Sequence, residues 1–158
     1  MLHAKRIHLP TQEYELTEDG RALTTFSLHR GRTGARFTLH GSDYSVRTHR
    51  FSGAFELLDA GGSVVATTDR VSRSWSITCR ERVVPFRRTA VADREHTMIG
   101  DDGEPAGTIR RTGHVHSETT ADLPGLDLVL QVFAVVVVLL RRRRKRTAAA
   151  VRATSAGG

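Results

Sequence analysis

The sequence predicts one mostly β domain, an antiparallel sandwich or barrel of about ten to twelve short strands followed by a single hydrophobic helix. Three observations predict this fold. Short runs that alternate apolar and polar residues recur along the chain, and Gly-containing turns separate them. A longer uncharged segment follows the last of these runs, and a cluster of basic residues comes directly after it. A chain of 158 residues fits one such domain with a single core.

The strands are expected to pair as hairpins. The clearest hairpin turns at residues 59–62 (DAGG), between two apolar runs. Gly20 and Gly103 mark two more turns, and we expect Gly62 and Gly103 to adopt positive φ or to lie in tight turns. Further strands are expected at 22–28, 36–40, 44–48, 75–79, 83–86, 95–99, 106–110 and 114–118. A closed or nearly closed sheet accommodates this number of short strands.

The uncharged segment 128–140 is expected to be helical. Its thirteen residues include only one polar side chain, Gln131, and the run is too long for an ordinary strand. Asp122 and Pro124 suit a helix start, so the helix is predicted near 123–144. A helix that is apolar on all sides is buried in protein or in lipid. Thirteen residues cover about 20 Å, short of a ~30 Å hydrocarbon core, which favours burial in protein and leaves a membrane span as the alternative.

The positive charge of the chain is concentrated at its C-terminal end. The net charge is +7, and no acidic residue follows residue 140. The basic residues there are Arg141, Arg142, Arg143, Arg144, Lys145, Arg146 and Arg152. The first 140 residues hold 17 basic and 17 acidic side chains, so a nucleic-acid partner is not expected for the folded body. We expect an N-terminal lead-in at 1–13, one domain at 14–144 and a disordered basic, Ala/Gly-containing tail at 145–158.

An arginine-containing loop is the first candidate binding site. Arg30, Arg32 and Arg36 lie in a segment with two glycines, RGRTGAR. Glycine allows close approach of the backbone, and the guanidinium fork matches the oxygen atoms of a phosphate. The alternative interpretation is an ordinary surface loop. Together with Arg141–Arg144, Lys145 and Arg146, these residues are the candidates for binding phosphate or a lipid headgroup.

A weaker candidate is a metal site on the last predicted strand. His114, His116 and Glu118 alternate along this strand, so the three side chains would share one face. Two imidazoles and a carboxylate are a partial ligand set for zinc or iron. The polar outer face of a strand explains the same pattern, and we favour that explanation, with no metal or cofactor expected.

No motif in the sequence indicates an enzyme. Serine and histidine residues are frequent, but no Gly-x-Ser-x-Gly elbow links them, and no Walker A motif is present. Residues 101–104 (DDGE) lack the ligand spacing of an EF-hand. Cys79 is the only cysteine, which excludes an intrachain disulfide. The first ten residues lack the apolar region of a signal peptide, so a cytoplasmic location is expected.

Several turn and core motifs resemble the tubby C-terminal-like superfamily, and in particular the small bacterial proteins akin to the LURP-one-related and phospholipid scramblase-like families. The motifs are FELLDAGGSVVA at 55–66, WSI at 75–77, IGDDG at 99–103, GTI at 107–109, and Leu123-Pro124 leading into the helix. The likeness covers roughly residues 14–142. It implies a β-barrel wrapped around a central hydrophobic helix, and it makes anionic phospholipid a plausible partner. A single cysteine rules out the acylated cysteine cluster of scramblases, so calcium-dependent scrambling is not implied.

The expected function is therefore that of a non-enzymatic binding domain. Its partner would be anionic phospholipid or another protein, and its location the cytoplasm, peripheral at the inner membrane surface. The first alternative is a bitopic membrane protein with one C-terminal transmembrane helix. In that case Arg141–Arg146 would hold the C-terminus in the cytoplasm and the β domain would lie across the membrane. The second alternative is a metal-binding β-barrel.

Overall fold

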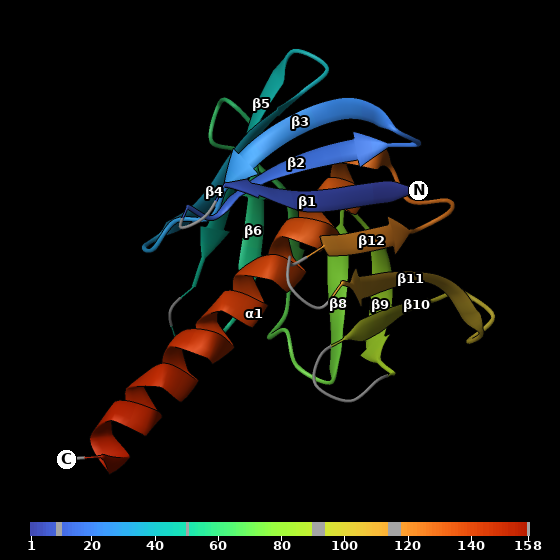
Figure 1. Ribbon diagram of the computed structural model, residues 1–158. Helices are drawn as coiled ribbons and strands as arrows, with labels where there is room; N and C mark the ends of the chain where they lie inside the picture. Colours follow the sequence, from blue (N-terminus) through green and yellow to red (C-terminus); the bar gives the residue numbers. More distant parts are fainter. Residues whose placement is uncertain (9–10, 50, 90–93, 114–117, 158) are drawn as a thin grey trace.

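The computed structural model describes residues 1–8, 11–49, 51–89, 94–113 and 118–157 (Figure 1). The described residues form one antiparallel sheet of twelve strands in the order β3-β2-β1-β12-β11-β10-β9-β8-β7-β6-β5-β4. The strands are β1 (Leu2–His8), β2 (Glu13–Glu18), β3 (Arg21–Ser27), β4 (Thr33–Leu39), β5 (Ser42–Thr48), β6 (Phe55–Leu58), β7 (Val64–Thr68), β8 (Ser74–Cys79), β9 (Arg82–Arg88), β10 (Glu95–Ile99), β11 (Pro105–Thr112) and β12 (Glu118–Asp122).

The sheet curls into a nearly closed barrel. Consecutive strands pair with each other except β3 and β4, and β1 also pairs with β12, which joins the first and last strands of the chain. The described residues leave the ladder open only between β3 and β4, and these two strands lie side by side. This architecture confirms the predicted antiparallel barrel.

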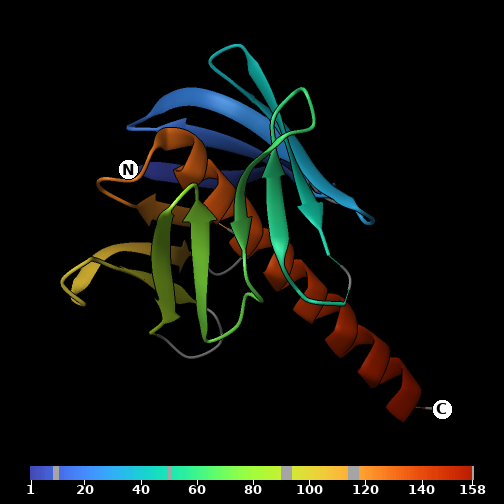
Figure 2. The same ribbon diagram turned by 180° about the vertical axis from the view of Figure 1, so that it is seen from behind.

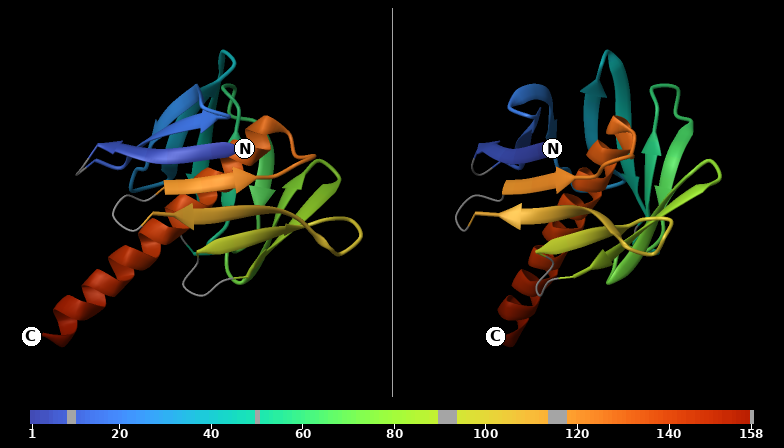
Figure 3. Two further views of the ribbon diagram at one scale, coloured as in Figure 1. Left: turned by 45° about the vertical axis from the view of Figure 1, so that its right-hand side comes forward. Right: turned by 90° about the vertical axis from the view of Figure 1, so that its right-hand side faces the viewer.

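The single helix, α1 (Leu128–Ala156), runs through the barrel (Figures 1 and 2). It starts beside the end of β12, and its first turns are surrounded by strands before it leaves at the opposite end (Figure 3). From Val132 to Val138 no residue exposes more than 1% of its surface. The structure therefore selects the protein interior for the apolar segment. No helix of the described residues is long and apolar enough to cross a membrane.

The helix differs from the prediction at both ends. It begins at Leu128 rather than near 123, because Gly125 adopts a φ of +78° and holds the preceding residues in a turn. It continues to Ala156, where a disordered tail was expected from 145. Arginine, lysine and alanine are among the strongest helix formers, and no glycine interrupts them before Gly157. The exposed part of α1, residues 144–156, is called the arm below.

The N-terminal segment is part of the barrel and not a lead-in to it. Leu2 and Ala4 are 1% and 0% exposed, and β1 pairs with β2 on one side and with β12 on the other. The intervening His3 and Lys5 are less buried, so the strand alternates in the usual way. This alternation is short and its apolar members are few, which is why the sequence pattern did not indicate a strand there.

The tight turns were placed correctly, and one glycine has a role that the sequence pattern did not indicate. Gly62 and Gly103 have φ values of +81° and +80°, as predicted for these hairpins. Gly107, on β11, is required for a different reason. A Cβ atom there would lie 2.5 Å from the backbone oxygen of Asp122, so only glycine lets β11 approach β12 this closely.

An aromatic cluster and a buried hydrogen bond anchor one wall of the core. Trp75 stacks on Phe86 with ring centroids 4.3 Å apart. Its indole Nε1 donates a hydrogen bond of 3.1 Å to Nδ1 of His96, and both residues are 1% exposed. Since Nδ1 accepts this bond, the ring nitrogen that carries a hydrogen in the neutral imidazole is Nε2.

Candidate functional site

Four consecutive arginines of α1 lie where the helix leaves the barrel. This end of the barrel is called the mouth. Residues spaced by about 100° on a helix point in different directions, so Arg141–Arg144 reach different walls. Arg141 Nε donates to the backbone oxygen of Val71, at the β7–β8 connection. Arg142 Nη1 donates to Thr119 Oγ1 on β12 at 2.9 Å. These bonds fix the helix at the mouth, where its buried segment ends.

The other two arginines turn toward the side of the barrel that holds β2 and β6. The guanidinium of Arg144 lies over the ring of Phe55, 5.5 Å from its centroid. Arg143 is half-buried and interacts electrostatically with Arg30 and Tyr14. Arg30 belongs to the β3–β4 loop, so the structure joins two basic segments that are far apart in sequence.

A groove of about 660 Å³ lies between the arm and the β3–β4 loop. Its cationic members are Arg30, Arg143, Arg144 and Arg152, and its apolar members are Leu140, Ala148 and Val151. His29 and Gly31 of the β3–β4 loop, Thr48 of β5 and Thr147 of the arm complete the lining. None of the described residues that line it is acidic. We call this feature the basic groove.

Arg143 has no acidic partner among the residues that the structure describes, and its surroundings disfavour its charge. Burial lowers the pKa of its guanidinium and the nearby charge of Arg30 lowers this pKa further, while Tyr14 raises it. Its Nη1 atom is hidden from solvent and has no hydrogen-bond acceptor among the described residues. A buried donor without an acceptor is costly. An anion bound in the groove near Arg143 and Arg30 would supply negative charge beside both guanidinium groups.

A second recess lies on the other side of Arg143. It has a volume of about 70 Å³ and is lined by Arg111, Arg142 and Arg146 together with Gln12 and Tyr14. Arg143 therefore stands between two cationic recesses at the mouth, of which the basic groove is much the larger.

The structure brings only some of the predicted binding residues together. Arg30, Arg143 and Arg144 meet in the basic groove. Arg32 is exposed on the same loop, and its backbone oxygen accepts a hydrogen bond of 2.7 Å from the Thr48 amide. Arg36, by contrast, lies on β4 in a separate recess that also contains an acidic residue, so it is not part of the groove.

The remaining predicted residues have varied positions. Lys145 is exposed on the arm, and Arg146 lines the smaller recess. Glu118 Oε2 lies within hydrogen-bond distance of His3 Nε2, at 3.2 Å. His114 and His116 lie outside the described residues, and within the described part no three His, Cys, Asp or Glu side chains are grouped to hold a metal ion.

Arg152 was not among the predicted site residues, although it lines the groove. It lies two helical turns after Arg144, and residues at i and i+8 share one face of a helix. That spacing would have indicated its position had the tail been predicted to be helical.

Comparison of the chain with protein-family models, with curated proteins and with solved structures finds no match. The fold and the site define a class of molecule: a β-barrel filled by a helix, with a cationic groove at its mouth.

Proposed function

We propose that this protein is a non-enzymatic domain that binds anionic phospholipid surfaces peripherally through the basic groove. The observation that carries the proposal is that Arg30 and Arg143, from distant parts of the chain, line one groove with apolar side chains beside them and no acidic residue among its described lining. Guanidinium groups donate paired hydrogen bonds to phosphate oxygens. The apolar side chains beside them suit the glycerol and upper acyl region of a phospholipid.

The expected strength is that of reversible attachment. A cationic side chain near an anionic leaflet contributes about 1 kcal/mol, and salt screens this contribution over ~8–10 Å. Four arginines line the groove, so their sum corresponds to a salt-sensitive association and not to permanent insertion. The apolar part of α1 is committed to the barrel core and is not available to anchor the protein in lipid.

The proposal is in keeping with the resemblance to the tubby C-terminal-like superfamily. A barrel wrapped around a hydrophobic helix is the architecture that this resemblance implies, and the chain has this architecture. We therefore include in the proposal a tubby-like, LURP-one-related type of binding domain, acting at the cytoplasmic surface of a membrane. A protein partner with an acidic, partly apolar segment is the second candidate, because the same groove offers it complementary charge.

The test is co-sedimentation with phosphatidylcholine vesicles, with and without phosphatidylserine. The full-length protein should bind the anionic vesicles, ignore the neutral ones, and dissociate as salt rises from ~50 to 500 mM. The variant Arg30→Gln/Arg152→Gln removes one exposed cation from each wall of the groove. It should lower the partition coefficient about 30-fold, at about 1 kcal/mol per charge.

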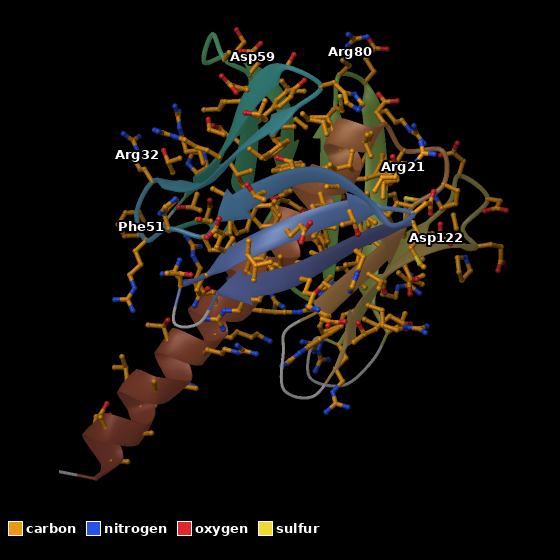
Figure 4. The ribbon with its side chains drawn as sticks, turned by 45° about the horizontal axis from the view of Figure 1, so that its top comes forward. Arg21, Arg32, Phe51, Asp59, Arg80 and Asp122 are labelled. Carbon is orange, nitrogen blue, oxygen red and sulfur yellow. The ribbon has the colours of Figure 1, made fainter. Side chains whose placement is uncertain are left out.

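The matched control is Arg21→Gln/Arg80→Gln, which makes the same change in net charge. Both arginines are exposed and lie at the opposite end of the barrel (Figure 4). At that distance screening should leave binding nearly unchanged. Equal losses in the two double variants, or equal binding to neutral and anionic vesicles, would contradict the proposal. Capture of an acidic peptide without vesicle binding would favour the second candidate.

A further inference from the structure

The topology sorts the charges of the barrel between its two ends. Because consecutive strands are antiparallel, successive connections alternate between the mouth and the far end. The connections at the far end hold seven acidic side chains and one basic side chain. The acidic ones are Asp19, Asp59, Glu81, Asp101, Asp102, Glu104 and Asp127, and the basic one is Arg80.

The mouth has the opposite charge. Its connections, in the part that the structure describes, hold five arginines and one acidic residue, Asp69. The five are Arg30, Arg32, Arg70, Arg73 and Arg94, and the arginines of α1 emerge among them. Residues 1–140 have no net charge, yet the barrel that they form is strongly polarised along its axis. A molecule polarised in this way turns its basic end toward an anionic surface before contact.

One exposed aromatic side chain lies at the same end. All six phenylalanines, both tyrosines and the tryptophan are within the described residues, and among them only Phe51 is fully exposed, at 103%. It lies in the β5–β6 connection, whose His49 oxygen accepts a hydrogen bond of 3.1 Å from the Gly53 amide. Figure 4 places Phe51 next to Arg32 on the side from which the arm leaves.

The loop of Phe51 is attached to the wall of the basic groove. Thr48, the last residue of β5, lines the groove and donates from Oγ1 to the Gly31 oxygen at 2.9 Å. Its amide donates to the Arg32 oxygen at 2.7 Å. The two loops thus form one edge of the mouth, with cations on one and an exposed ring on the other. Cations beside an exposed aromatic ring are the composition of a surface that binds at a membrane interface.

We propose that the barrel docks on an anionic bilayer with its mouth toward the lipid, and that the ring of Phe51 inserts among the headgroups beside the basic groove. The inference rests on the proposed function and adds the orientation and the inserting residue. The partner is a lipid surface and not a soluble polyanion, because Phe51 gains nothing by burial unless an apolar phase is present.

Insertion is tested by fluorescence quenching with brominated lipid in anionic vesicles. Trp75 is the only tryptophan and is 1% exposed in the core, so the wild type gives the background. Phe51→Trp places a second indole at the proposed contact. Val64→Trp is the matched control, because Val64 is 54% exposed in the far-end hairpin. Only Phe51→Trp should gain a component that brominated lipid quenches.

A second experiment measures vesicle affinity after substitution by alanine at the same two positions. Phe51→Ala should lower the partition coefficient about tenfold and leave its salt dependence unchanged, because it removes apolar burial and no charge. Val64→Ala should have no effect. Since both side chains are exposed, circular dichroism melts should match the wild type for all variants.

The outcomes separate the two proposals. If the wild type binds anionic vesicles but Phe51→Trp and Val64→Trp are quenched equally, the mouth-first orientation is overturned while the proposed function stands. If the wild type binds no vesicle, both fail. If heparin binds the protein and displaces it fully from anionic vesicles, and if Phe51→Ala binds vesicles as well as the wild type does, the mouth recognises polyanions. The insertion of Phe51 is then overturned. Selective quenching of Phe51→Trp with weaker binding of Phe51→Ala supports the inference.

Discussion

The buried part of α1 forms the core of the barrel, and replacing Phe133 with alanine tests this directly. Phe133 lies in the middle of the apolar segment of α1 and is 0% exposed. Deleting a fully buried phenylalanine ring costs about 3–5 kcal/mol, since the surrounding strands cannot close the cavity completely. For a chain of this size each kcal/mol lowers Tm by about 2–4 °C, so we expect a fall of about 6–20 °C. A native domain has only about 5–15 kcal/mol to lose.

The measurement is urea unfolding followed by the emission of Trp75, which lies in the core and reports loss of packing. The control is Val151→Ala on the same helix. Val151 is 62% exposed on the arm, so its truncation should change the unfolding free energy by less than about 0.5 kcal/mol. Equal effects of the two substitutions would refute the role of the helix as core. A cooperatively melting protein that lacks residues 124–158 would refute it as well.

Three further predictions concern the barrel itself. Gly107→Ala should destabilise more than Gly103→Ala in thermal melts, although only Gly103 has positive φ, because the new Cβ of the former would lie 2.5 Å from a backbone oxygen; the reverse order would contradict this. His96→Phe should cost about 1–3 kcal/mol and shift the emission of Trp75, since the buried indole N–H loses its acceptor. The Thr89 hydroxyl, followed by the Arg110 guanidinium, lowers the pKa of Glu95 below its ordinary value of 4.5. The stabilisation from this carboxylate is therefore complete above pH 4.5, and it is lost as the pH falls through the lower pKa of the folded state. The urea midpoint of Glu95→Gln should lie below that of the wild type at pH 7, and the two midpoints should converge in acid.

The parts of the fold that the sequence predicted are those with local causes. Gly62 and Gly103 indicated tight turns because the φ angle of a turn is set within a few residues. The apolar run at 128–140 indicated a helix because it is too long for a strand, and its length pointed to burial in protein. Strand β1 was missed because its two buried residues are too few to give a clear alternation. Gly107 was missed because its constraint comes from β12, which is distant in sequence.

The candidate site was predicted only in its components. Basic residues at 30–36 and 141–146 were recognised from composition, but nothing in the sequence relates one segment to the other. Arg30 meets Arg143 because α1 crosses the whole barrel and emerges beside the β3–β4 loop. Arg36 is not part of the basic groove, because it lies further along β4, away from the mouth. Ala148 and Val151 line the groove only because α1 continues past the mouth as a helix.

The sequence by itself determined most of the strands, the tight turns and the apolar part of the helix, because backbone preference and hydrophobic periodicity act over a few residues. It also determined the amount of charge, 17 basic and 17 acidic residues in the first 140. Only the tertiary structure decided where this charge lies. Antiparallel pairing places alternate connections at opposite ends of the barrel, so the balanced charge of the first 140 residues is divided between an acidic far end and a basic mouth.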